Sequence, residues 1–306
     1  MKKTIKIFSI LLTYFVSLIV LYLISMPFIY IGSTIILILN DNKNLFYLII
    51  GILIVLLPII LLTFFTFKEL KKSILDFLNE ELEVDNENVE FYIVNENQLK
   101  DIYDKKLLNY IKDIKRKLNY QKEVLIIRAR NSNIVNAFAI SNLSGEAIVV
   151  YDGILKNFTE GEIKAILGHE FGHLKNRDSL YKIMIYSMNY VYPYIDRLNY
   201  TVINFLKNIP YINLLALIFV INDSLIKVLN RFLVVPLITV ILQFSSRQAE
   251  FLADEIGARV TMPKYMINAL KRISENEQKN DNLLMKILST HPPTQKRIEY
   301  LKNLKG

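Results

Sequence analysis

Two histidines and a glutamate form the pattern with the clearest chemical meaning in this chain. His169, Glu170 and His173 read H-E-x-x-H, and the chain has only three histidines in all. Residues four apart on a helix share one face, so both imidazoles can reach one metal ion. Glu170 then stands where it can take a proton from a water that attacks a substrate carbonyl. The pattern predicts one zinc ion per chain and a hydrolytic reaction; the alternative is a histidine pair with a structural role only.

A catalytic zinc takes three protein ligands, so a third donor must come from another part of the chain. The chain has no cysteine, which excludes a thiolate ligand, a disulfide and a cysteine nucleophile. His291 is one candidate. Glu250 and Asp254 are the others, because on a helix one of them can bind the metal while the other accepts the N–H of a ligand imidazole. Spacing alone does not choose among these, nor does it exclude an ordinary exposed pair of carboxylates.

A helix must carry the H-E-x-x-H residues, and the sequence before them predicts where it begins. Thr159 and Glu162 have the spacing of a capping box, which predicts a helix from Glu160 to about Lys175. Apolar residues at helical spacing predict an amphipathic helix over 96–119, which we interpret as packing on the core. Alternating and β-branched residues predict three strands, at 124–129, 136–141 and 146–151, with a hairpin turn between the last two.

Two long apolar runs near the N-terminus are free of charged residues. They cover residues 7–39 and 45–67, and each is long enough to cross a bilayer. The first run is too long for the apolar core of a signal peptide, so a retained transmembrane hairpin is expected. Lysines precede the first run and follow the second, whereas the connecting loop is nearly neutral, and this bias places both outer ends in the cytoplasm. The lysines are Lys2, Lys3, Lys6, Lys68, Lys71 and Lys72.

A second apolar region lies between the H-E-x-x-H segment and the acidic pair. Charged residues interrupt it, so we expect two imperfect spans near 183–205 and 211–240, or helices embedded in the membrane that do not cross it. Because one zinc ion cannot be shared across a bilayer, the number of crossings in this region must be even. The expected domains are 1–67 (two transmembrane helices), 68–182 (first part of the catalytic domain), 183–244 (apolar helical insertion) and 245–306 (second part of the catalytic domain).

Four segments together resemble one family. They are N-A-F-A at 136–139, H-E-F-G-H-L-K-N-R-D at 169–178, S-R-Q-A-E-F-L-A-D at 246–254 and S-T-H-P-P-T-Q-K-R-I at 289–298. Their order and spacing, over about 130–300, resemble the HtpX-like membrane metalloproteases, which are relatives of the zinc-dependent CaaX prenyl protease. The resemblance implies a zincin-type α+β domain, with Glu250 as the third zinc ligand and Asp254 as the carboxylate that supports the ligands.

Three further parts of the expected site concern the substrate. The negative oxygen that forms during peptide hydrolysis needs a donor besides the metal, and His291 is the natural candidate, with Arg297 as a second contact to this oxygen or to substrate. The alternative for His291 is a residue that only starts a helix after two prolines. The segment Asn136, Ala137, Phe138 and Ala139 could offer a sheet edge to which an extended substrate adds, or it is an ordinary core strand.

Composition agrees with a membrane enzyme. Hydrophobic residues make up 52% of the chain and the mean hydropathy is +0.29. The net charge of +8 comes from lysines and arginines that flank apolar segments, so no nucleic-acid partner is expected. We expect a mainly α multi-pass protein of the cell membrane, a zinc metalloendopeptidase with its site facing the cytoplasm. Its expected substrates are proteins or peptides, membrane proteins among them, and the resemblance implies a role in quality control. The alternatives are a prenyl-protein processing enzyme of the same fold and an inactive scaffold or metal-binding protein.

Overall fold

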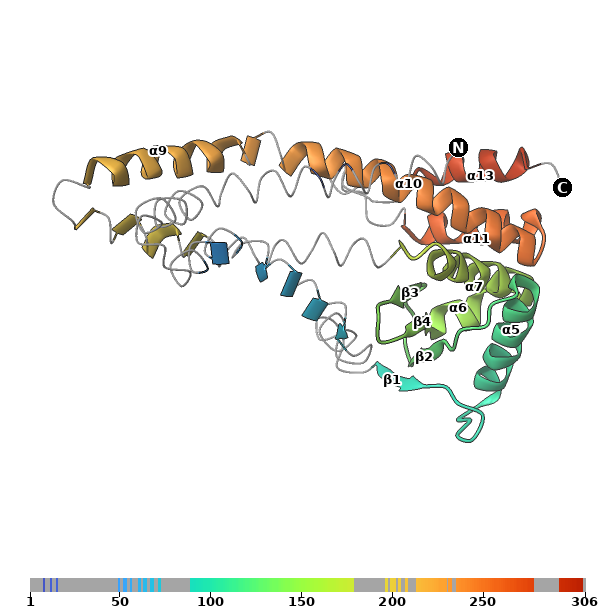
Figure 1. Cartoon of the computed structure of the whole chain (residues 1–306). Coiled ribbons are helices and arrows are strands. Elements are labelled where there is room, and N and C mark those ends of the chain that lie inside the picture. The colour runs from blue at the N-terminus through green and yellow to red at the C-terminus, as the bar shows by residue number, and fades with distance from the viewer. Residues whose placement is uncertain are drawn as a thin grey trace. The chain divides into compact units, whose positions relative to one another are not determined.

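The computed structural model describes residues 89–178, 213–229, 235–277 and 292–304, with scattered positions between 8 and 72 and between 196 and 232 (Figure 1). The chain divides into two compact units. Unit 1 comprises Met1–Lys6, Lys71–Tyr181 and Gln243–Gly306, and unit 2 comprises Ile7–Leu70 and Lys182–Leu242. Most of the expected spans 7–39, 45–67 and 183–205, and His291, lie outside the described residues, whereas most of the fourth expected span, 211–240, is described. Within the described part of the chain, no helix is both long enough and apolar enough to cross a membrane.

A mixed sheet of four strands forms the centre of unit 1. The strands are β1 (Glu90–Ile93), β2 (Leu125–Arg130), β3 (Ala137–Ser141) and β4 (Glu146–Tyr151), in the order β1-β2-β4-β3. β2 and β4 are parallel, and the two outer strands are antiparallel to their neighbours. The three expected strands are confirmed to within one residue at each end. β1 was not expected; it is a short edge strand whose pairing partner lies far along the chain.

Two helices of unit 1 cover one face of this sheet. Helix α5 (Ile102–Leu118) and helix α7 (Glu160–Lys175) share one buried apolar cluster with alternate residues of β2 and β4. Helix α5 begins six residues later than the amphipathic pattern predicted. The reason is Asp101, whose carboxylate accepts the amides of Tyr103 at 2.9 Å and Asp104 at 3.2 Å and so caps the helix there.

A buried arginine joins α5, the sheet and the short helix α6 (Asp152–Asn157). Arg128 on β2 donates to Asp101 at 2.6 Å, Asp104 at 2.9 Å and Asp152 at 2.6 Å. Burial works against the charge on Arg128, but the three carboxylates outweigh it and raise the pKa of the guanidinium. This arginine and its three carboxylates therefore fix the start of α5 and the turn that leads into α6 and α7. If they separated, the buried charge of Arg128 would remain uncompensated.

The C-terminal half of the chain contributes α10 (Val235–Val260), α11 (Pro263–Glu277) and α13 (Thr294–Lys302), and unit 2 contains α9 (Asn213–Leu229). Small residues bring α10 against α7. A Cβ atom placed on Gly172 would lie 2.7 Å from the Cα of Ala253, and one placed on Gly168 would lie 3.1 Å from the Cα of Gly257. The two helix backbones therefore approach as closely as they do only because these positions lack side chains.

Candidate metal centre

Helix α7 carries the H-E-x-x-H residues on its buried side. It begins and ends where the sequence predicted, and the Thr159 amide donates to the Glu162 carboxylate at 2.8 Å, as a capping box requires. His169 and Glu170 are 7% and 6% exposed. Apolar residues on other sides of the helix pack into the main core, which sets the rotation of α7 about its axis. The metal-binding residues are therefore held on a helix that has little freedom to turn.

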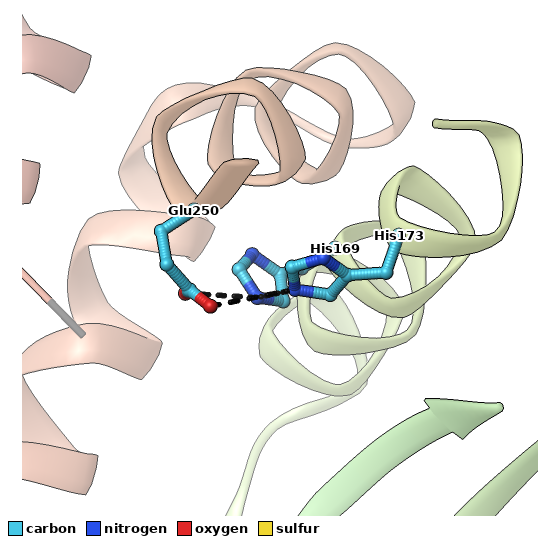
Figure 2. A group of neighbouring side chains, drawn as sticks. All are labelled: His169, His173 and Glu250. Carbon is cyan, nitrogen blue, oxygen red and sulfur yellow. Dashed lines mark hydrogen bonds and ion pairs between the residues drawn. The ribbon is translucent and has the colours of Figure 1, made fainter. Parts of the chain in front are cut away.

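Helix α10 brings two carboxylates to the same place. Glu250 and Asp254 lie one turn apart on it and are 4% and 0% exposed. Figure 2 shows the Glu250 carboxylate pointing toward the two imidazoles of α7. The ligands on α7 and α10 are about 80 residues apart in sequence. They meet because the two helices approach closely at Gly172.

The two imidazole nitrogens and the two oxygens of the Glu250 carboxylate have separations that suit a tetrahedral metal site. His169 Nε2 and His173 Nε2 are 3.1 Å apart, and they lie 3.5 Å and 3.6 Å from the nearest Glu250 oxygens (Figure 2). Nitrogen and oxygen ligands about 2.0 to 2.2 Å from a tetrahedral zinc stand about 3.3 to 3.6 Å from each other. In the described part of the chain, these residues form the one group of three or more potential ligands with this spacing. The donor set fits zinc.

A buried ion network supports the first imidazole. The Nδ1 atom of His169 lies 2.9 Å from Asp254 Oδ1, and Arg297 of α13 holds both Asp254 oxygens, at 2.6 Å and 2.7 Å. A hydrogen on Nδ1 that points at Asp254 leaves the Nε2 lone pair directed at the metal position. Arg297 is also 3.3 Å from Glu250. It therefore orients the aspartate and offsets part of the negative charge.

The charges around His169 favour a cation. Burial disfavours the imidazolium form, but Asp254, Glu250 and Glu170 outweigh it and raise the pKa of His169. Burial also works against the charge on Asp254, but Arg297 and His169 outweigh it and hold the pKa of this carboxyl below its usual value. An ionised carboxylate group around two imidazoles is an electrostatic environment that attracts a positive ion.

Asp178 is a residue of the site that sequence reasoning did not assign. Its Oδ2 atom lies 2.7 Å from Nδ1 of His173, so it supports the second imidazole as Asp254 supports the first. Asp178 follows the end of α7, where Arg177 adopts a left-handed conformation with φ 54°. A helix that continued past Lys175 would carry the residue five positions after His173 to another side. Spacing therefore gave no signal; only the turn at Arg177 brings the carboxylate back.

The other expected site residues have different outcomes. Arg297 contacts Asp254 and Glu250, and its expected contact with an oxyanion or substrate stays a prediction. The expected substrate segment forms β3, with Asn136 O accepting the Tyr151 amide just before it, and β3 lies at one edge of the sheet. α7 packs against this edge strand.

Comparison with known proteins finds relatives of this chain. A protease HtpX homolog of Methanocaldococcus jannaschii is 33% identical over 189 residues, covering 54% of this chain and 64% of the relative. One of Sulfurihydrogenibium sp. is 30% identical over 206 residues, covering 56% and 65%. The crystal structure of S. mikatae Ste24p is 18% identical and covers 95% of this chain and 66% of that one, with a TM-score of 0.49.

The matches to the two HtpX homologs thus span slightly less than two thirds of those relatives' length. The family model described as peptidase family M48 matches residues 102–305, a range that includes all three candidate ligands and Glu170. The resemblance seen in the sequence motifs is confirmed. On this match, the chain belongs to peptidase family M48.

Proposed function

We propose that this protein is a zinc-dependent endopeptidase anchored in a membrane. The observation that carries the proposal is the convergence of His169, His173 and Glu250, with donor separations of 3.1 to 3.6 Å, beside a buried glutamate on the same helix. Three protein ligands leave a position open, which distinguishes a catalytic zinc site from a structural one. A protein that only bound metal would have no use for Glu170.

Each residue of the site has a distinct task in this proposal. When bound, zinc acts as a Lewis acid that lowers the pKa of water and polarises a carbonyl. Glu170 accepts the proton of the attacking water and delivers it to the leaving amine. Asp254 and Asp178 hold the tautomers and ring orientations of His169 and His173. We propose that His291 donates to the oxyanion.

The substrate is an extended segment of protein in this proposal. β3 is an edge strand, and it packs against α7, the helix that carries two of the ligands. A peptide that pairs with the outer edge of β3 would run past the metal position with its backbone hydrogen-bonded and its side chains on alternating faces. Main-chain pairing reads little side-chain identity, so we expect broad specificity among unfolded or extended segments.

We further propose a multi-pass protein whose site faces the cytoplasm. The uncharged runs at 7–39 and 45–67 and the lysines outside them support this orientation, and the metal ligands at 169–173 and 250 must share one side. A cytoplasmic protease held at the membrane suits the removal of damaged membrane proteins. The chain has no cysteine, so single cysteines at Asn42 and Asn280 can be labelled on intact cells with an impermeant thiol reagent. We expect label at Asn42 only; label at Asn280 would overturn the orientation.

Digestion of casein by the detergent-purified, zinc-loaded protein tests the catalytic proposal. Glu170→Gln should keep its zinc and lose cleavage, because the ligands remain while the proton acceptor is gone. Glu160→Gln is the matched control: this side chain lies on the same helix and is 62% exposed, and its loss should leave cleavage unchanged. Full activity of Glu170→Gln would refute the proposal. A prenylated CaaX peptide, included as a second substrate, would reveal a prenyl-protein processing enzyme if it alone were cleaved.

A further inference from the structure

The turn between β3 and β4 holds the chain at the point where unit 1 resumes after the second apolar run. Asn142 Nδ2 donates to the carbonyl of Lys72 and Ser144 Oγ donates to the carbonyl of Lys71, each at 2.7 Å. The Asn142 Oδ1 atom accepts the amides of Ser144 at 2.8 Å and Gly145 at 3.1 Å, which closes the turn on itself. Leu143 stands between the two donors and is 58% exposed.

Two more exposed apolar side chains lie at the same end of the sheet. Strand pairing places the end of β1 and the starts of β2 and β4 beside the end of β3, and Ile93 and Leu125, at that end, are 41% and 39% exposed. Both project from the face opposite α5, because their partners Ile127 and Ala147 belong to the apolar cluster on that face. We call Ile93, Leu125 and Leu143 the apolar rim.

The rim is rigidly connected to the metal helix. Glu146, the first residue of β4, is buried and accepts hydrogen bonds from the Tyr120 hydroxyl and the Lys122 ammonium group. The ring of Tyr120 packs edge-on against Phe171, within the H-E-x-x-H segment, with ring centroids 5.4 Å apart. An aromatic contact and a buried carboxylate therefore set the distance between the turn and α7.

Single exposed leucines are ordinary on protein surfaces, so the rim needs a reason to be distinguished from them. The reason is its attachment. Lys71 follows Phe67, where the uncharged run at 45–67 ends, and four residues of chain span at most about 14 Å. The turn bonded to Lys71 thus stays close to the end of that run. Lysines at 68, 71, 72 and 122 accompany the apolar rim, and this combination is typical of segments that bind the interface of anionic membranes.

We propose that the apolar rim rests on the lipid surface, with Leu143 inserted at the level of the headgroups. This inference rests on the membrane anchoring proposed above, but not on catalysis. It deepens the proposed function, because β3 leads directly into the turn, so the edge strand that would pair with substrate has its C-terminal end at the bilayer surface. Segments of membrane proteins that emerge from the bilayer would then meet β3 first, before soluble chains.

The chain contains no tryptophan, so one introduced indole reports its own surroundings alone. The full-length Leu143→Trp variant is reconstituted into vesicles of phosphatidylcholine and phosphatidylglycerol, with and without bromine on the acyl chains near the headgroup. Ile102→Trp is the matched control, because Ile102 is 65% exposed and lies away from the rim. It begins α5 beside Asp101, and Asp101 binds Arg128, which lies toward the end of β2 that is farther from the rim. We expect blue-shifted emission and quenching by brominated lipid for Leu143→Trp, and neither for Ile102→Trp.

The outcomes separate the two proposals. If Leu143→Trp and Ile102→Trp emit alike and neither is quenched, the lipid contact of the rim is refuted, while Glu170-dependent cleavage can persist. If the protein fails to float with vesicles at all, the membrane anchoring falls and the rim contact with it. If quenching of Leu143→Trp is strong but cleavage does not depend on Glu170, the lipid contact stands and the catalytic proposal fails. Replacing Asn142 and Ser144 by alanine in Leu143→Trp should reduce the quenching, since the turn then loses its bonds to Lys71 and Lys72.

Discussion

Gly172 is the position where one added methyl group should separate the metal ligands without touching any of them. In Gly172→Ala, the new Cβ would lie 2.7 Å from the Cα of Ala253, a backbone atom of α10 that cannot rotate away. Carbon atoms in contact prefer about 3.5 to 4.0 Å, so α7 and α10 must separate by roughly 1 Å. A metal site tolerates errors of only about 0.2 Å in ligand distance. Glu250 should therefore leave the coordination distance of His169 and His173.

The expected magnitude follows from two costs. Overpacking of this kind destabilises a fold by about 1 to 3 kcal/mol, which the domain should survive. Zinc affinity should fall by at least about 10-fold, because even the loss of a residue behind a ligand has an effect of about 10 to 100-fold. Competition with a chromophoric zinc chelator measures the affinity, and thermal unfolding of the zinc-free protein measures the stability.

A matched glycine on the same helix controls for the substitution itself. A Cβ on Gly161 would meet the ring of Tyr265 at 2.5 Å; this ring lies on α11, which carries none of the three ligands, so Gly161→Ala should keep its zinc affinity. If Gly172→Ala binds zinc as tightly as the unaltered protein, the close approach of α7 and α10 does not position Glu250, and the reasoning fails.

Four other substitutions separate the zinc ligands from the residues that support them or contact the oxyanion. Glu250→Ala should lose zinc on dialysis, whereas Asp254→Asn should weaken binding by about 10 to 100-fold; equal zinc in both would move the third ligand elsewhere. Asp178→Asn should weaken binding in the same range, since His173 loses its carboxylate acceptor, and an unchanged chelator titration would contradict this role. His291→Phe should retain zinc and lower kcat by about 100 to 1,000-fold with little change in KM, as removal of an oxyanion donor does. Zinc loss in that variant would instead identify His291 as a ligand.

Local features of the sequence predicted the metal helix completely. The capping box, the spacing of His169 and His173 and the extent of α7 all lie within one short segment, and the interactions that set them connect residues three or four apart. The three strands were likewise predicted from alternation and turn residues. Glu250 and Asp254 were recognisable as a pair, but their separate roles followed from the family resemblance and not from spacing.

Only the tertiary structure decided features that depend on residues distant in sequence. The amphipathic pattern predicted a start for α5 upstream of Ile102. The helix starts at Ile102 because Asp101 caps it there and accepts a hydrogen bond from Arg128 on β2. β1 pairs with a strand more than 30 residues away, so no local signal marked it. Helix α10 runs through residues 244 and 245, and the domain division expected there stays a prediction.

At the metal site, the roles of Asp178 and Arg297 also depended on tertiary structure. Asp178 reaches His173 only through the left-handed residue after α7, and Arg297 reaches Asp254 only because α13 packs on α7 and α11 through Ile298 and Leu301. The amino-acid sequence alone determined which residue types could bind zinc and accept a proton, because that chemistry resides in the side chains and their helical spacing. The packing of helices from separate segments decided which carboxylates support which imidazole, because hydrogen-bond partners are chosen by distances that exist only in the folded chain.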